Sequence, residues 1–208
     1  TQVALQRCPD LLVLPPQMSK YRHISQHIHR IFQQYTDIIE PLSLDEAYLD
    51  VSDSEHFQGS AGRIAFAIRQ QIFEQHGLTA SAGISCNKML AKIASDWLKP
   101  NGQYTVQPAQ VADFVRPLPV AKLPGVGKVH QQKLQDMGAF VCADLQRISE
   151  ALLQDKFGKF GRQLARLRFG QDDRPVQPSS HRQSISVEHT FPEDLPNLAA
   201  CLDQLPAL

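Results

Sequence analysis

Apolar residues between positions 38 and 52 follow a two-residue period. Residues 38–44 and 47–52 are rich in β-branched, leucine and aromatic side chains, and Ala47, Leu49 and Val51 alternate with more polar neighbours. This period is typical of strands with one buried face. The pattern therefore predicts two strands joined by a bend near residues 45 and 46.

Longer segments on either side of this hairpin show the period of amphipathic helices. The predicted helices cover residues 19–35, about 59–76 and 87–98. Further strands are predicted at residues 11–14, which end at two prolines, at 78–85, and at an edge position over 104–106. This order of elements predicts an α+β sandwich, in which an antiparallel or mixed sheet is covered on one face by helices.

From residue 108 the pattern becomes all-helical and its segments shorten. A Leu-Pro-Gly-Val-Gly-Lys stretch at residues 123–128 precedes a predicted helix, which indicates a helix–hairpin–helix motif. The segment 172–182 is polar and rich in Pro and Ser, as linkers are. After it, residues 183–191 alternate as a strand does, and residues 197–205 begin another helix.

Composition and charge narrow the class of protein. Hydrophobic residues make up 42% and charged residues 20%, which is ordinary for a globular protein, and no apolar run is long enough for a membrane span. The four cysteines are far apart and form no CxxC pair, as expected for reduced cytoplasmic thiols. The net charge is zero, but residues 120–190 carry 11 Lys and Arg against 7 Asp and Glu. Phosphate contacts are therefore expected in that segment.

Two adjacent carboxylates, Asp45 and Glu46, stand at the predicted bend. In a regular strand neighbouring side chains point to opposite faces, whereas at a bend both can lean toward one point. Two crowded carboxylates repel each other unless a cation lies between them, and Mg²⁺ is the usual hard cation. An exposed acidic turn without a ligand is the alternative interpretation.

Three other positions carry candidate chemistry. Lys99 follows a helix directly before Pro-Asn-Gly, where it either complements the helix dipole or binds a phosphate. The turn at Gly125, Val126 and Gly127, followed by Lys128, either is a plain turn or offers backbone N–H groups to a DNA phosphate. His23 and His27 have metal-binding spacing, but no third ligand follows in the usual pattern.

Five motifs in one order resemble the Y-family lesion-bypass DNA polymerases, most closely the bacterial DNA polymerase IV type. They are Ser-Leu-Asp-Glu-Ala-Tyr-Leu-Asp at 43–50, Ser-Ala-Gly-Ile-Ser at 81–85, Asn-Lys-Met-Leu-Ala-Lys-Ile-Ala-Ser-Asp at 87–96, Lys-Pro-Asn-Gly at 99–102 and Leu-Pro-Gly-Val-Gly at 123–127. The resemblance implies a partial palm over 1–107, a thumb over 108–173, a linker over 174–182 and the start of a little finger domain over 183–208.

The resemblance also assigns roles to residues. Asp45 is expected to bind two catalytic Mg²⁺ ions, and Glu46 to be the second metal-binding carboxylate beside the primer 3′-hydroxyl. Lys99 is expected to hold the incoming dNTP, and the turn from Gly125 to Lys128 to grip primer–template DNA. The implied activity is error-prone translesion synthesis in the cytoplasm, with a sliding clamp as partner of the intact protein and no membrane contact.

One departure from the family pattern sets a further expectation. The family has an earlier palm strand with another metal-binding aspartate, followed by the fingers, and no part of this sequence matches either. We therefore expect an internal fragment with little or no polymerase activity of its own. Two alternatives remain open at this point: a nucleotide cyclase with a similar palm, and a DNA-binding remnant that has lost its chemistry.

Overall fold

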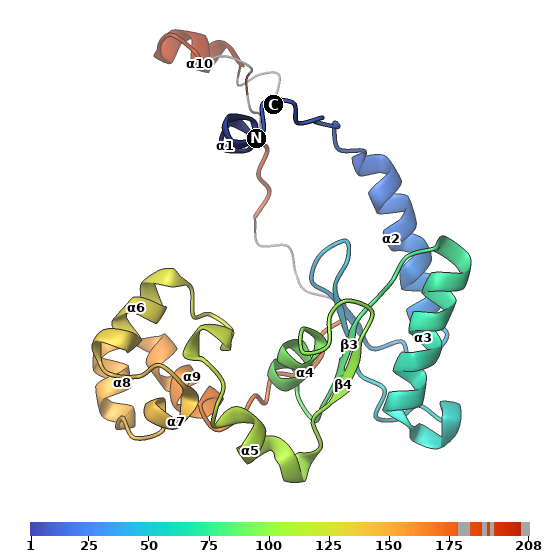
Figure 1. The fold of residues 1–208 in the computed structure, drawn as a ribbon, viewed down its shortest axis with the longest axis vertical. Coiled ribbons are helices and arrows are strands. Elements are labelled where there is room, and N and C mark those ends of the chain that lie inside the picture. Colours follow the sequence, from blue (N-terminus) through green and yellow to red (C-terminus); the bar gives the residue numbers. More distant parts are fainter. Residues whose placement is uncertain (179–183, 189–190, 192–193, 205–208) are drawn as a thin grey trace. The chain divides into compact units, whose positions relative to one another are not determined.

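The computed structural model of the chain describes residues 1–178, 184–188, 191 and 194–204 (Figure 1). The chain divides into two compact units, Thr1–Pro178 and Ser179–Leu208. The second unit contains helix α10 (Leu198–Gln204). Across the described ranges, no helix combines the length and the apolar character that a membrane crossing requires.

The first unit contains all the other elements. Its helices are α1 (Gln2–Arg7), α2 (Met18–Phe32), α3 (Ala61–His76), α4 (Lys88–Ser95), α5 (Val111–Val115), α6 (Lys128–Asp136), α7 (Cys142–Leu145), α8 (Glu150–Phe157) and α9 (Lys159–Leu167). Short 3-10 turns are η1 (His56–Gly59), η2 (Pro108–Gln110) and η3 (Val120–Lys122). Its strands are β1 (Ile39–Pro41), β2 (Ala47–Leu49), β3 (Ala82–Ile84) and β4 (Gln103–Thr105).

The α+β class predicted from the sequence is confirmed, but the described strands form two small sheets instead of one. Strands β1 and β2 pair antiparallel, with Ile39 opposite Leu49 and Pro41 opposite Ala47. Strands β3 and β4 pair parallel, with Ala82 opposite Gln103. Strands β1, β2 and β3 are shorter than the apolar pattern suggested, because the pattern records burial and the strand bounds record ladder hydrogen bonds, whereas β4 has the predicted length and begins one residue earlier.

The strand predicted over residues 11–14 is wrong. These residues form no strand, and their side chains remain exposed, with 80% of Leu12 accessible to solvent. A strand requires a neighbouring backbone to satisfy its N–H and C=O groups, and no described strand pairs with this segment. An apolar run alone does not specify such a partner.

Two apolar cores hold the first unit together. The smaller one joins α2 to α3 through Ile31, Tyr35, Ile64, Ile68 and Ile72, and the β2 side chain of Leu49 packs against it. The two helices lie side by side in Figure 1. Because β2 contributes to this core, the hairpin is fixed to the helices behind it.

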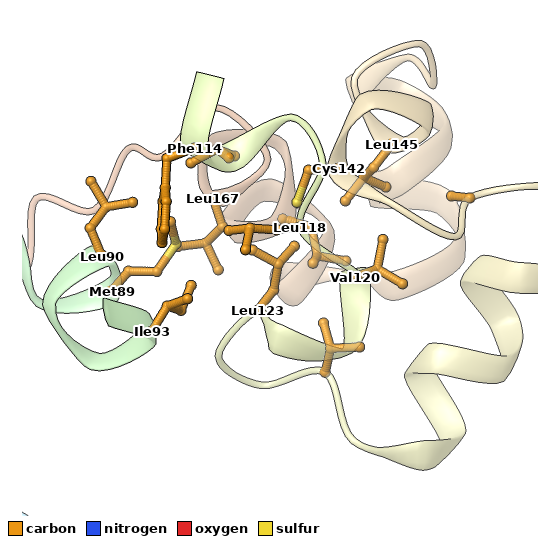
Figure 2. Packing of buried hydrophobic residues seen from close by; sticks show 14 of the residues in the cluster. Met89, Leu90, Ile93, Phe114, Leu118, Val120, Leu123, Cys142, Leu145 and Leu167 are labelled. Carbon is orange, nitrogen blue, oxygen red and sulfur yellow. The ribbon is translucent and has the colours of Figure 1, made fainter. Parts of the chain in front are cut away.

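The larger core joins α4 to the helices that follow residue 108. Figure 2 shows Met89, Leu90 and Ile93 of α4 gathered with Phe114 and Leu167, all of them buried. Helix α4 also packs closely on β3, since a Cβ placed on Gly83 would lie 2.0 Å from the Ala91 carbonyl oxygen. Helix α4 is therefore a rigid support, held by the sheet on one side and by the later helices on another.

Candidate active site

The β1–β2 hairpin carries the two predicted carboxylates at its tip. The Leu42 N–H donates to the Glu46 carbonyl oxygen at 2.9 Å, which closes the turn. Within the turn, the Ser43 hydroxyl donates to Asp45 Oδ1 at 2.6 Å. Both Asp45 and Glu46 are exposed at this bend.

Two lysines one turn apart on α4 bind the hairpin, and sequence reasoning did not identify either. The buried Lys88 donates to Glu40 Oε2 of β1 at 2.5 Å, and its ammonium lies 5.0 Å from the centre of the Tyr48 ring. Lys92 forms an ion pair with Glu46 Oε1. The sequence does show two lysines four residues apart on a predicted helix, which places them on one face. That spacing does not indicate which acidic residues they pair with.

The pKa of Lys99 is raised by neighbouring carboxylates, including the two at the hairpin tip. Its ammonium pairs with Asp96 at 2.6 Å, and this hydrogen bond raises the pKa of Lys99. The nearby carboxylates of Glu46 and Asp45 raise that pKa further. Among the described residues Lys99 forms no ion pair with Asp45 or Glu46, and their charges act on it only through space. The pairing with Asp96 was not foreseen.

The donors at the tip suit a divalent cation that arrives with a phosphate ligand. Asp45 and Glu46 supply carboxylate oxygens, which are the ligands that hard cations prefer. Among the residues the structure describes, no group of three or more His, Cys, Asp and Glu side chains could hold a metal. Mg²⁺ is commonly bound by one or two carboxylates together with substrate phosphates. The two carboxylates fit that mode of binding.

The predicted histidine pair does not form a metal site in the described chain. His23 and His27 lie with ring centres 4.3 Å apart, and His27 lies 5.5 Å from His76. These rings are nevertheless not part of any group of three that could hold a metal. We therefore assign them to the packing of α2 against α3.

The glycine turn before α6 is built on an aromatic support. Gly125 has φ +84°, a conformation that favours glycine, and a Cβ there would lie 2.6 Å from the Phe160 ring. The His130 ring stacks on Phe160, and its Nδ1 lies 3.0 Å from the Gly125 carbonyl oxygen. Neither His130 nor Phe160 was anticipated, because both lie outside the motif.

Val126 differs from its neighbours in the turn. Its side chain is buried in the larger core, and its N–H donates to the Leu123 carbonyl oxygen at 3.1 Å. In contrast, the N–H groups of Gly125, Gly127 and Lys128 have no acceptor within the described ranges. The expectation that Val126 offers a free donor is therefore corrected: Val126 holds the turn, and the other three present the donors.

Residues 170–177 return to the hairpin and are held there. Asp172 accepts hydrogen bonds from the Met89 N–H and from Arg174, the latter at 2.7 Å. The Gln177 N–H donates to Glu40 Oε2 at 2.8 Å. The predicted linker is thus attached over its first residues, since Pro and Ser content does not reveal hydrogen bonds that join distant segments.

Comparison with known proteins gives two family matches. Residues 1–96 match the model described as the impB/mucB/samB family, and residues 121–172 match the model of a DNA polymerase-iota thumb domain. Both of the contact networks described above, the hairpin with its lysines and the glycine turn, lie largely within these matched ranges.

Curated relatives of this chain are named DNA polymerase IV. The one from Pseudomonas syringae pv. tomato is 58% identical over 205 residues, which cover 99% of this chain and 58% of the relative. The one from Pseudomonas aeruginosa strain PAO1 is 57% identical, with 99% of this chain and 59% of the relative covered. The chain thus spans somewhat over half the length of the relatives it matches.

Solved structures agree with the sequence matches. A Y-family DNA polymerase chimera has a TM-score of 0.79 and 31% identity, covering 86% of this chain and 53% of that one. An insertion ternary complex of Dbh DNA polymerase has a TM-score of 0.78 at the same identity, covering 85% and 52%. With its hairpin carboxylates, its glycine turn and these matches, the chain belongs to the Y family of DNA polymerases and resembles the DNA polymerase IV type.

Proposed function

We propose that this chain is the palm and thumb part of a translesion DNA polymerase that extends a primer from dNTPs. The observation that carries the proposal is the pair of exposed carboxylates, Asp45 and Glu46, at the hairpin tip, and their charges raise the pKa of Lys99. The high identity to proteins named DNA polymerase IV supports it. The thumb match at residues 121–172 argues against a nucleotide cyclase, which has no use for a DNA grip.

In the proposed reaction the primer 3′-oxygen forms a bond to the α-phosphorus of the dNTP, and the bond to pyrophosphate breaks. Two divalent ions, which we propose to be Mg²⁺, stabilise the attacking and leaving oxygens when bound. Asp45 and Glu46 would hold these ions with their carboxylate oxygens. The turn keeps the two carboxylates at one point, and Ser43 fixes Asp45 through its 2.6 Å hydrogen bond.

Lys99 has a different role in this proposal. Its side chain is 53% exposed and that of its partner Asp96 is 43% exposed, so the ion pair is weak and Lys99 can exchange Asp96 for a triphosphate. We propose that it offsets negative charge on the departing pyrophosphate. A lysine does this as a point charge, without the directional pairing that an arginine would impose.

DNA binding is assigned to the turn before α6. The unpaired N–H groups of Gly125, Gly127 and Lys128 lie at a helix N-terminus and are exposed, a setting that favours a phosphate oxygen. Such contacts carry no base information, so we expect binding that is independent of sequence and weakens with salt.

The proposal divides the chain into a palm over residues 1–107, a thumb over 108–173, a linker over 174–182 and the start of a little finger domain over 183–208. It extends to the partners of a longer protein that contains this sequence. These are primer–template DNA, dNTP and a sliding clamp, in the cytoplasm. The lesion-bypass role rests on the relatives alone.

Single-nucleotide primer extension tests the proposal in a polymerase of the same length as the curated relatives that contains this sequence. Asp45→Asn should reduce incorporation by about a thousandfold or more, the scale of losing a metal-based catalytic group. Lys99→Gln should mainly raise the KM for dNTP. Lys156→Gln is the matched control, because it changes a lysine whose ion pair in the described residues is with its neighbour Asp155. Unchanged incorporation by the Asp45→Asn protein would overturn the assignment.

A further inference from the structure

The Lys92–Glu46 ion pair has no role in the function proposed so far. It joins α4 to the hairpin tip and is partly exposed, with 35% of the Lys92 side chain and 43% of the Glu46 side chain accessible. It is the only side-chain hydrogen bond of Glu46 within the part of the chain that the structure describes. The orientation of the Glu46 carboxylate therefore depends on Lys92.

The two partners differ in how firmly they are held. Lys92 projects from a helix whose Met89, Leu90 and Ile93 are buried in the larger core, and its own carbonyl accepts a hydrogen bond from Ser95. Glu46 lies in the hairpin turn, where backbone hydrogen bonds hold its main chain and Lys92 is the described hydrogen-bond partner of its carboxylate. The lysine is thus the fixed member of the pair, and the carboxylate is the member that is positioned.

The neighbouring carboxylate is positioned in another way. Asp45 accepts a hydrogen bond from the hydroxyl of Ser43, which is neutral and belongs to the same turn. A hydroxyl does not neutralise the carboxylate, whereas the ammonium of Lys92 does. Of the two adjacent acids, only Glu46 therefore forms an ion pair within the described part of the chain.

We propose that Lys92 is a positioning residue for Glu46 and that its ammonium competes with a divalent cation for the Glu46 carboxylate. The inference rests on the proposed metal role of Asp45 and Glu46. An ammonium and a metal ion both require the lone pairs of the same carboxylate, so cation binding at Glu46 weakens or replaces the ion pair. Lys92 then lowers the affinity of the tip for a cation that arrives without a nucleotide.

Binding of Mn²⁺ to the chain, measured at low ionic strength by the relaxation rate of water protons, tests this inference. Lys92→Met should bind Mn²⁺ about two- to fivefold more tightly than the unchanged chain, the scale expected for losing a partly exposed ion pair. Lys92→Arg keeps the charge and should bind within about twofold of the unchanged chain. Lys156→Met removes the same charge from α8 and should have no effect.

A second measurement follows the ion pair itself. The ¹⁵N signal of the Lys92 ammonium should shift when Mg²⁺ is added, while that of Lys156 should not. This readout needs no catalysis and no DNA, so it reports on the pair directly. If the Lys92 signal does not shift at Mg²⁺ concentrations that saturate the site, the proposed competition is wrong.

The outcomes separate the inference from the proposed function. If Lys92→Met binds Mn²⁺ no more tightly than the unchanged chain, while Asp45→Asn with Glu46→Gln abolishes binding, the inference fails and the metal assignment stands. If the doubly substituted chain binds Mn²⁺ as the unchanged chain does, the ion lies elsewhere and both fail. Tighter binding by Lys92→Met, together with loss in the doubly substituted chain, supports both.

Discussion

Replacing Lys88 by Met tests how the hairpin is held against α4. Lys88 donates to Glu40 at 2.5 Å and to the Pro175 carbonyl oxygen at 3.2 Å. Its side chain is only 10% exposed, and that of Glu40 is 20% exposed. Met has a similar length and no charge, so the substitution removes the cation while it leaves the apolar contacts of the lysine stem.

The expected cost follows from this burial. Removing one partner of a fully buried ion pair costs about 3–5 kcal/mol, because the other charge is left without compensation. Glu40 is partly exposed and keeps its hydrogen bond from the Gln177 N–H, so we expect a smaller loss, about 2–3 kcal/mol of unfolding free energy. Glu40→Leu combined with Lys88→Met removes both charges and should recover at least about 1 kcal/mol.

The pKa of Glu40 determines how the effect of Lys88→Met on stability changes with pH. Burial alone would raise the pKa of Glu40, but the hydrogen bonds from Lys88 and Gln177 outweigh it and hold the pKa below its usual value. A lowered native pKa stabilises the fold above the unfolded pKa, and this contribution is lost as pH falls through the native pKa. The difference in unfolding free energy between the unchanged chain and Lys88→Met should therefore be largest at pH 7 and should decrease as the pH is lowered.

Urea unfolding followed by circular dichroism measures these free energies at pH 7 and at stepwise lower pH. Lys156→Met provides the control for removing a lysine from an exposed site. A loss below about 0.5 kcal/mol for Lys88→Met at pH 7 would refute the reasoning, as would a difference that grows on acidification.

Three further predictions concern the proposed thumb and the thiols. Gly161→Ala should destabilise the fold by about 1–3 kcal/mol in urea unfolding, because its Cβ would lie 2.0 Å from the Leu153 carbonyl oxygen; unchanged stability would contradict this packing. Gly127→Ala should leave stability intact, since nothing lies within 4 Å of its Cβ, yet weaken duplex binding about tenfold in fluorescence anisotropy by screening the free N–H groups; equal affinity would argue against the phosphate contact. Cys142 is buried, and burial raises the pKa of its thiol to about 12, so mass spectrometry of the native chain treated with N-ethylmaleimide should show three modified cysteines and not four.

The hairpin tip was predictable because its signal is local. The two-residue period on each side of residues 45 and 46 requires a reversal there, and β1 and β2 pair across it. That the two adjacent acids bind a ligand stays a prediction. The glycine turn was predictable for the same reason, because a glycine between two helical segments indicates a turn, and Gly125 does adopt a positive φ there.

Contacts between distant segments were not predictable. The partners of Lys88 and Lys92 lie 48 and 46 residues away in the sequence, and no periodicity links a helix face to a particular strand. The attachment of Gln177 to Glu40 spans 137 residues. The support of Gly125 by Phe160 is likewise a tertiary contact. Whether residues 11–14 have a strand beside them is also decided by tertiary structure, and no described strand pairs with them.

Iron-directed cleavage tests the central claim, that the hairpin tip is a cation site beside Lys99. Fe²⁺ added with ascorbate and peroxide substitutes for the ion and cuts the nearby backbone, and mass spectrometry locates the cuts. We predict cuts within residues 42–47 and 96–101 of the unchanged chain, and loss of both in Asp45→Asn with Glu46→Gln. Cuts confined to other segments, or cuts at the tip that survive both substitutions, would contradict the account.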